Sequence, residues 1–165
     1  MIFVILGSQK YQFNRLLQKI DEMIQAGSIS DKVIAQSGYS TYKPKNYVSK
    51  DFFKRAEFVE HIRKSDIIIT HGGTGAIVTA LKEEKKIIGV ARKKAFGEHV
   101  DDHQEEIVSV FDRMGLILEA KNLDDLDSII KKIEKKDLSK FISGNKMFLK
   151  SLKDDLRELG EQYGE

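Results

Sequence analysis

The stretch THGGTGAIVTALKEE (residues 70–84) places three glycines within four positions, directly after the run DIII and before a pattern typical of a helix. A continuous run of β-branched residues predicts a strand that is buried on both faces. A chain gives up side chains at a strand-to-helix junction for one of two reasons: a tight turn requires a flexible backbone, or a ligand must approach the backbone closely. The stretch therefore predicts a strand, a glycine turn and a helix, and it leaves open which reason applies.

Apolar runs and helical patterns alternate along the rest of the chain. Strands are predicted at residues 2–6, 32–36, 66–70, 87–91 and 116–119, a second helix at residues 51–64, and a loop at residues 38–51, which hold the only proline. Strands that alternate with helices predict an α/β domain with right-handed crossovers between parallel strands. We therefore expect a Rossmann-like parallel sheet with helices on both faces.

Three unusual loops follow predicted strands: GSQK (residues 7–10), THGGTG (residues 70–75) and GEHVDDHQ (residues 97–104). The carboxyl ends of parallel strands share one edge of the sheet, and ligands bind beyond that edge where the strand order reverses. We therefore expect the three loops to meet around one ligand.

Composition narrows the classes of function. The chain has 165 residues, 33% of them charged, a formal net charge of only +2, and no cysteine. A mixed surface argues against nucleic acid as the main partner, because phosphate binding usually needs a concentrated positive field. Disulfides and thiolate metal sites are excluded. The apolar opening IFVIL is too short for a signal peptide or a membrane span, so a soluble domain is expected.

The glycine loop is suited to an anion. A strand, then HGGTG, then a helix beginning near Ala76 would leave unpaired N–H groups at a helix N-terminus, where the helix dipole also favours negative charge. The candidate residues are His71, Gly72, Gly73, Thr74 and Gly75, with Gly7 and Ser8 from the first loop. The pattern is neither a Walker loop nor the G-x-G-x-x-G fingerprint. A glycine turn without a ligand remains the alternative, and for Ser8 taken by itself capping of the next helix is the favoured role.

The third loop is rich in polar side chains, with candidates Glu98, His99, Asp102, His103 and Gln104. His99 and His103 lie four residues apart, a spacing that would suit a metal, but HVDDH lacks the HExxH pattern and a third ligand is not evident. Carboxylates and amides at a strand's carboxyl end are suited to holding sugar hydroxyls. The alternative is a solvated, well-capped helix start.

Taken together, the segments IFVILGS, EFVEHIRKSDIIITHGGTGAIVTALKEEKKIIGVAR and GEHVDDHQEEIV resemble the C-terminal, donor-binding domain of GT-B glycosyltransferases of family 28. The small single-domain members are the most similar. They include the catalytic subunit of the two-part N-acetylglucosaminyltransferase of the dolichol pathway and bacterial subunits of capsule and exopolysaccharide synthesis. The resemblance covers about the first two-thirds of the chain, in the order that the family has.

The resemblance implies a role for each loop. Residues 71–75 would hold the diphosphate of a UDP-sugar, Gly7 and Ser8 would line the same cleft, and His103 and Gln104, with Glu98 fixing their loop, would contact the donor sugar. Such enzymes need no bound metal or other cofactor, because N–H groups and the helix dipole stabilise the departing UDP. Thr79 stands where relatives often carry a glutamate for the ribose, so ribose recognition departs from the family pattern.

The resemblance also implies a partner, because a GT-B enzyme needs two Rossmann-like halves. We expect residues 1–140 to form the UDP-sugar-binding half. An acceptor-binding subunit attached to the membrane would supply the other half and keep the chain at the cytoplasmic face, and a hexose would pass to a lipid-linked saccharide. No catalytic base is assigned, since the partner is a candidate to supply it. Alternatives are a non-catalytic accessory subunit, a stand-alone nucleotide-binding or hydrolytic domain, and self-association.

Residues 141–165 are predicted to form a helical tail. Its apolar stripe comprises Phe148, Leu149, Leu152, Leu156 and Leu159 on an otherwise charged helix. The stripe is suited either to packing on its own domain or to docking on the partner.

Overall fold

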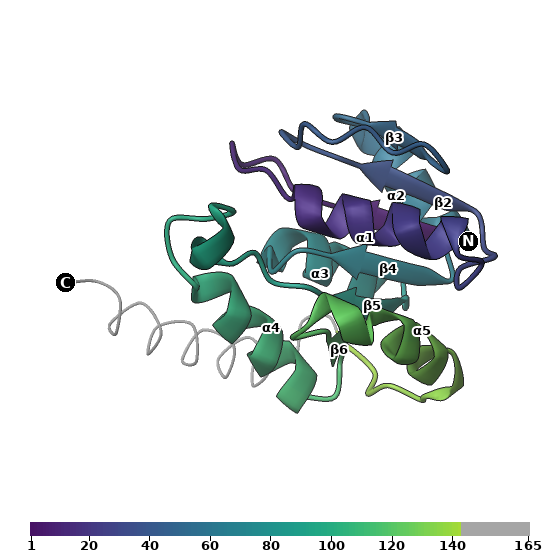
Figure 1. Cartoon of the computed structure of the whole chain (residues 1–165). Helices are drawn as coiled ribbons and strands as arrows, with labels where there is room; N and C mark the ends of the chain where they lie inside the picture. The colour runs from purple at the N-terminus through teal and green to yellow at the C-terminus, as the bar shows by residue number, and fades with distance from the viewer. Residues whose placement is uncertain (143–165) are drawn as a thin grey trace.

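The computed structural model describes residues 1–142 of the chain. Its core is one sheet of six parallel strands in the order β3-β2-β1-β4-β5-β6 (Figure 1). The strands are β1 (Ile2–Ile5), β2 (Val33–Gln36), β3 (Val48–Lys50), β4 (Ile67–Thr70), β5 (Lys86–Gly89) and β6 (Leu118–Glu119). The helices are α1 (Asn14–Gln25), α2 (Arg55–Lys64), α3 (Thr74–Lys82), α4 (His103–Arg113) and α5 (Leu126–Lys135), with 3-10 turns η1 (Lys94–Phe96) and η2 (Leu123–Asp125).

The alternation of side chains along the central strands explains why these strands are apolar throughout. In β1, Ile2 and Val4 pack with α1 and α5, whereas Phe3 and Ile5 pack with α2, α3 and α4 on the opposite face. All four side chains are buried. Successive side chains of a strand point to opposite faces, so a strand covered on both sides must be apolar at every position. The predicted Rossmann-like sheet with helices on both faces is therefore confirmed.

The strand order reverses between β1 and β4. β1 pairs with β2 on one side and β4 on the other, with Ile5 opposite both Gln36 and Thr70. The chain leaves β1 through α1 on one face of the sheet and leaves β4 through α3 on the other. The loops after these two neighbouring strands therefore diverge, and this arrangement opens a crevice at the carboxyl edge of the sheet.

Two predictions about the segment before β4 were wrong. Residues 38–51 were expected to form a loop, but Val48–Lys50 form the edge strand β3, which pairs in parallel with β2. This strand has three residues and Val48 is 65% exposed, so it carries no apolar pattern. The second helix begins at Arg55 rather than Asp51, where the Lys54 N–H donates to Glu57 Oε2 at 3.2 Å.

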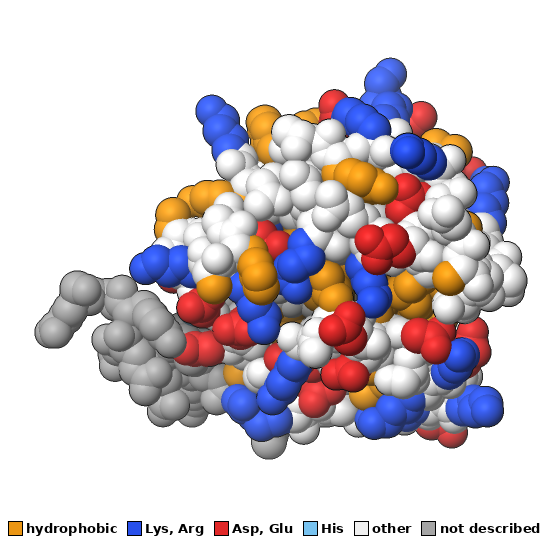
Figure 2. Space-filling view, viewed as in Figure 1, with side chains coloured by type: hydrophobic (Ala, Val, Ile, Leu, Met, Phe, Trp, Pro, Cys, Tyr) orange, Lys and Arg blue, Asp and Glu red, His pale blue; other side chains and the backbone are white. Residues whose placement is uncertain are grey.

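The remaining boundaries differ by three residues or fewer, and α3 begins at Thr74 rather than near Ala76. Lys and Arg side chains are interspersed with Asp and Glu over the face in Figure 2, as the small net charge leads one to expect. Within residues 1–142, no helix combines the length and apolar character that crossing a membrane requires. The predicted stripe from Phe148 to Leu159 lies outside the described residues.

Candidate functional site

A cavity of about 620 Å³ lies at the carboxyl edge of the sheet, where the strand order reverses. It is bordered by all three loops that the sequence singles out. Ten of the twelve predicted site residues line it: Gly7, Ser8, His71, Gly72, Gly73, Thr74, Gly75, His99, His103 and Gln104. We call this cavity the cleft. The structure therefore brings the three loops together, and the ligand that they hold stays a prediction.

The N-terminus of α3 opens into the cleft. Gly73 is the N-cap residue in an extended conformation, and no side chain caps the helix. The first main-chain bond of the helix joins the Ile77 N–H to the Gly73 carbonyl oxygen at 3.2 Å. The N–H groups of Thr74, Gly75 and Ala76 therefore have no intrahelical partner, and all three residues line the cleft. Such an end attracts an anion through its N–H groups and its dipole.

The glycines of this loop differ in what surrounds them. A Cβ at Gly72 would lie 2.6 Å from Gln104 Cβ, and one at Gly73 would lie 2.3 Å from His71 Nε2. A Cβ at Gly75, by contrast, would meet nothing within 4 Å. Gly72 and Gly73 are thus required by close packing of the loop itself, whereas Gly75 leaves open space at the helix N-terminus. Both reasons for a glycine-rich junction operate here, at different positions.

The His71 ring packs against the loop after β1. It also occupies the space of a side chain at Gly7, since a Cβ there would lie 2.4 Å from Nε2, and Gly7 has a φ of +66°. The Nδ1 atom lies 3.2 Å from the Ile5 carbonyl oxygen, which can only accept, so we assign the proton to Nδ1. Burial and the nearby Arg92 guanidinium lower the pKa of His71 to about 4. The ring is therefore neutral near pH 7.

The β5–α4 loop presents side chains rather than backbone. His99 Nδ1 lies 3.0 Å from Asp101 Oδ1, its Nε2 lies 3.3 Å from Gln9 Oε1, and its ring packs against Tyr11. Gln104 is buried against Gly72 and accepts a hydrogen bond from the Arg92 backbone N–H at 3.3 Å. The His99 contacts join the β5–α4 loop to the loop after β1, and Gln104 joins the start of α4 to the loop after β4.

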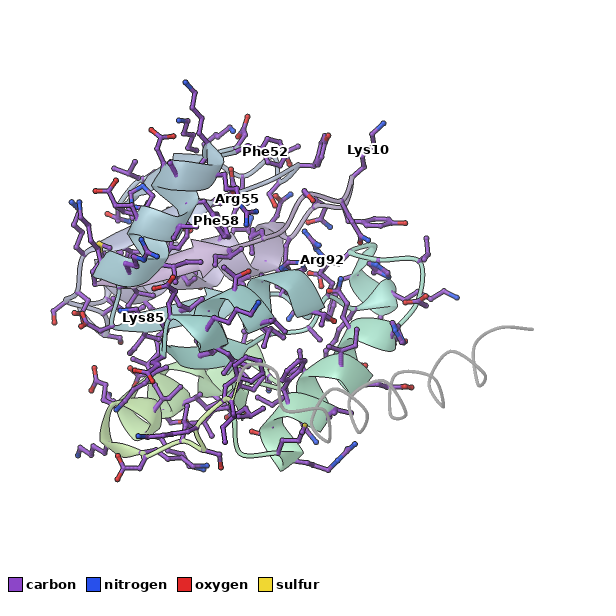
Figure 3. All side chains as sticks on the ribbon, turned by 180° about the vertical axis from the view of Figure 1, so that it is seen from behind. Lys10, Phe52, Arg55, Phe58, Lys85 and Arg92 are labelled. Atoms are coloured by element: carbon purple, nitrogen blue, oxygen red, sulfur yellow. The ribbon has the colours of Figure 1, made fainter. Side chains whose placement is uncertain are left out.

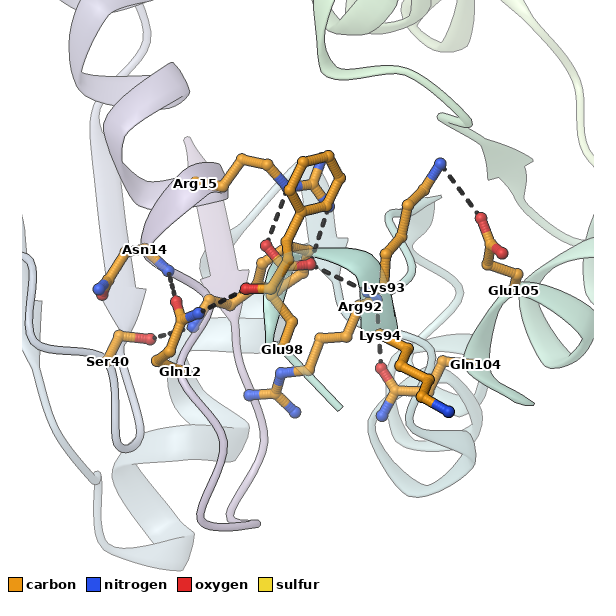
Figure 4. Close-up of polar contacts among 12 residues, drawn as sticks. Gln12, Asn14, Arg15, Ser40, Arg92, Lys93, Lys94, Glu98, Gln104 and Glu105 are labelled. Carbon is orange, nitrogen blue, oxygen red and sulfur yellow. Dashed lines mark hydrogen bonds and ion pairs between the residues drawn. The ribbon is translucent and has the colours of Figure 1, made fainter. Parts of the chain in front are cut away.

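Two predicted sugar contacts do not reach the cleft. Glu98 is fully buried, and its two oxygens accept from Arg15 Nε and Nη2 at 2.8 and 2.9 Å (Figure 4). It also accepts from the Lys93 backbone N–H at 2.9 Å. Asp102 is the N-cap residue of α4 and accepts from the Lys94 N–H at 2.9 Å. Both carboxylates are used within the loop, so their contribution is to its shape.

The charges around the cleft favour an anionic ligand. Within the described part of the chain, its lining includes the cation Arg55 but no Asp, Glu or Lys side chain. Among residues 1–142, no three His, Cys, Asp or Glu side chains come together as metal ligands would. Near-surface cations facing a cavity without carboxylates stabilise a bound negative charge.

Several lining residues had no signal in the sequence. Arg55 and Phe58 project from α2 (Figure 3), and Gln36 stands at the end of β2 with its Oε1 accepting from the Phe53 N–H at 3.1 Å. These residues reach the cleft only because the sheet order places α2 beside α3. Thr79 also lines the cleft and donates to the Gly75 carbonyl oxygen at 2.7 Å.

Sequence comparison identifies related proteins. The model of the glycosyltransferase family 28 C-terminal domain matches residues 1–158. The UDP-N-acetylglucosamine transferase subunit ALG13 of Debaryomyces hansenii is 27% identical over 95 residues, which cover 58% of this chain and 44% of that protein. The same subunit from Candida glabrata is 38% identical over 56 residues, 34% of this chain and 26% of that protein. The matches thus span less than half the length of these curated relatives.

Solved structures share the fold. The NMR solution structure of ALG13 superposes with a TM-score of 0.61 at 19% identity, over 92% of this chain and 94% of that chain. The crystal structure of Acinetobacter baumannii MurG gives 0.56 at 12% identity, over 80% of this chain and 41% of that chain. At these identities the structures are informative for the fold alone. The family resemblance is confirmed by the match over residues 1–158: the chain belongs to the glycosyltransferase family 28 C-terminal domain family.

Proposed function

We propose that this chain is the donor-binding subunit of a two-part UDP-sugar glycosyltransferase. The observation that carries the proposal is the uncapped N-terminus of α3, which faces a cleft lined by Arg55 and histidines and by no carboxylate. A nucleotide diphosphate matches that chemistry, because its oxygens accept from the N–H groups and its charge is favoured by the helix dipole. The curated relatives are named as subunits of a UDP-N-acetylglucosamine transferase, and this supports a UDP-sugar as the donor.

The cleft has two walls, the β4–α3 junction and the β5–α4 loop with the start of α4, and each has a role in this proposal. The N–H groups of Thr74, Gly75 and Ala76 bind the diphosphate and stabilise the charge that develops on UDP as it departs, so the mechanism needs no metal ion. His103 and Gln104 face the transferred sugar from the other wall. The nucleoside lies toward α2, where Gln36 and Phe58 line the cleft. These two residues take over its recognition, because Thr79 stands where relatives often carry a glutamate for the ribose.

The acceptor is bound elsewhere in the assembly. The described residues supply one Rossmann-like sheet, and we propose that a partner subunit supplies the other half, together with the general base. In this proposal the partner is anchored to the membrane, the acceptor is a lipid-linked saccharide, and transfer takes place at the cytoplasmic face. The names of the relatives support the partner, since ALG13 is named as a subunit.

Calorimetric titration of the full-length chain with UDP, ADP and GDP tests the donor site. We expect selective UDP binding that Gly75→Leu abolishes, because a Cβ at Gly75 would meet no atom within 4 Å and the larger side chain would occupy the space at the helix N-terminus. Lys82→Leu is the matched control, since Lys82 is exposed at the other end of the same helix. Equal affinity for all three nucleotides would contradict the assignment of uridine. A chain that binds no nucleotide, alone or with its partner, would favour the accessory role.

A further inference from the structure

Arg92 is a buried charged residue at the end of an apolar strand segment. It follows Val90 and Ala91 directly after β5, and its side chain has no exposed surface. Its Nη2 donates to the Leu6 carbonyl oxygen at 2.6 Å and to the Tyr11 carbonyl oxygen at 3.1 Å. These carbonyls flank the loop that contains Gly7 and Ser8. The guanidinium therefore ties the loop after β1 to the end of β5 (labelled in Figure 3).

The charge of Arg92 has no full partner among residues 1–142. Its Nε and Nη1 atoms are buried without a hydrogen-bond acceptor. Burial lowers the pKa of Arg92 to about 10, while the charge of Glu98 opposes that shift. Both oxygens of Glu98 are, however, already bound to Arg15. The Phe13 ring, 5.7 Å from the guanidinium, offsets part of the cost. Arg92 thus stays charged at pH 7 in a place where an unpaired charge is costly.

The cleft lies within electrostatic reach of this charge. The Arg92 guanidinium donates to the carbonyl oxygen of Leu6, and the next residue, Gly7, lines the cleft. The same guanidinium lowers the pKa of His71, which also lines the cleft. The backbone N–H of Arg92 donates to Gln104, which also lines the cleft. Because His71 is neutral near pH 7, the positive charge around the cleft comes from Arg55, which lines it, and from the buried Arg92. An anion in the cleft would act as its missing counter-ion.

We propose that Arg92 is a positioning residue with a fixed charge: its buried guanidinium sets the shape of the loop after β1 and is neutralised when a nucleotide diphosphate enters the cleft. This inference rests on the proposed function, because it takes the donor's diphosphate as the anion. It assigns a role to a residue that contacts no ligand: Arg92 acts by holding the Leu6 carbonyl and by the electrostatic field of its charge.

A series of ligands with increasing negative charge distinguishes an electrostatic effect of Arg92 from a structural one. Uridine, UMP and UDP are titrated into wild-type chain, Arg92→Met and Arg92→Lys, with Lys93→Met as the control. Lys93 is the next residue along the chain, and its ammonium pairs at the surface with Glu105, where solvent screens it. For Arg92→Met we expect a loss of affinity on the order of tenfold for UMP and larger for UDP, with uridine changed by less than about twofold.

The lysine variant keeps the test decisive if the methionine variant does not fold. Lys keeps the charge but lacks the planar guanidinium whose Nη2 donates to the Leu6 and Tyr11 carbonyls, and burial lowers the pKa of its ammonium toward neutrality. We expect Arg92→Lys to bind UDP more weakly as the pH rises from 7 to 8.5, while its uridine binding and the UDP binding of the wild-type chain stay level.

Three outcomes decide the matter. Losses that grow with ligand charge, or the pH dependence in Arg92→Lys, support the proposal. Equal losses for uridine and UDP, with no such pH dependence, would show a purely structural role and overturn it while leaving the donor site intact. If the wild-type chain binds no UDP, alone or in complex with its partner, the proposed function and this inference fail together.

Discussion

The β4–α3 junction and the β5–α4 loop face each other across the cleft but are built in opposite ways. The first is three residues long, from His71 to Gly73, and offers backbone N–H groups. The second is longer and offers side chains, and it is held in place by a carboxylate at Glu98 that the solvent never reaches. A short turn can be shaped by glycines alone, whereas a long loop needs an internal anchor. Each wall therefore fails through a different kind of substitution.

The largest effect is expected from removing the anchor of the β5–α4 loop. Glu98→Ala leaves Arg15, whose side chain is 25% exposed, without its partner and removes the acceptor of the Lys93 N–H. Breaking a largely buried ion pair should lower the free energy of unfolding by about 3 kcal/mol, as measured by urea denaturation. Glu105→Ala, which breaks the surface pair with Lys93, should cost less than about 1 kcal/mol. Similar losses in both variants would refute the role of anchor.

Acid should destabilise the junction through His71. Its pKa is about 4 in the folded chain against 6.5 for an ordinary histidine, so the unfolded chain binds the proton more tightly. The stability from this group is fully present above about pH 6.5 and is lost as the pH falls toward 4, by about 2–3 kcal/mol. Unfolding free energies from pH 7 to 4 should therefore fall less steeply in His71→Asn. Parallel curves for the two proteins would contradict the neutral, buried ring.

A smaller loss is expected at Gly73. Gly73→Ala places a Cβ against the buried His71 ring, and such overpacking should lower the free energy of unfolding by about 1–2 kcal/mol. His71→Ala removes the ring, so in the double variant the alanine at residue 73 should cost much less. A double-mutant cycle measured by urea denaturation gives this coupling. Additive losses would mean that the two residues do not share this space.

The smallest effect on stability is expected at Gly75. Alanine is a better helix former and meets no atom within 4 Å, so Gly75→Ala should leave the free energy of unfolding unchanged or raise it by up to about 1 kcal/mol. Its Cβ enters the space at the helix N-terminus, so UDP affinity should fall several-fold in calorimetry. A loss of stability equal to that of Gly73→Ala would erase the distinction between the two glycines.

The sequence was sufficient to predict the sheet and the wall of the cleft at the β4–α3 junction. Strands such as Ile67–Thr70 are apolar at nearly every position because helices cover both faces, and that pattern is visible without coordinates. The edge strand Val48–Lys50 was not predictable, because its alternate side chains face solvent and its partner β2 lies in another part of the chain.

The second wall was predictable only in part. The cluster of polar residues around His99 indicated the right loop, but composition could not tell which carboxylates turn inward. Glu98 turns inward because the fold brings Arg15 to it, and Asp102 stays exposed but is bound to the Lys94 N–H. Arg55 and Phe58 escaped notice for the same reason: their place beside the cleft is set by the sheet order. Arg92 did leave a signal, a charge directly after the apolar run at residues 87–91.

The central pairing of β1 with β4 has a consequence for how the domain opens. Ile5 and Thr70 lie opposite each other although 65 residues separate them along the chain, and the cleft stands over that pair. A partly unfolded chain that has lost this pairing has no cleft, so it cannot hold a ligand there. The amide hydrogens of the two central strands should exchange with solvent only through global unfolding. A nucleotide that binds only the folded chain would slow that exchange by a factor of 1 + L/Kd, where L is the free nucleotide concentration and Kd its dissociation constant, in both strands at once.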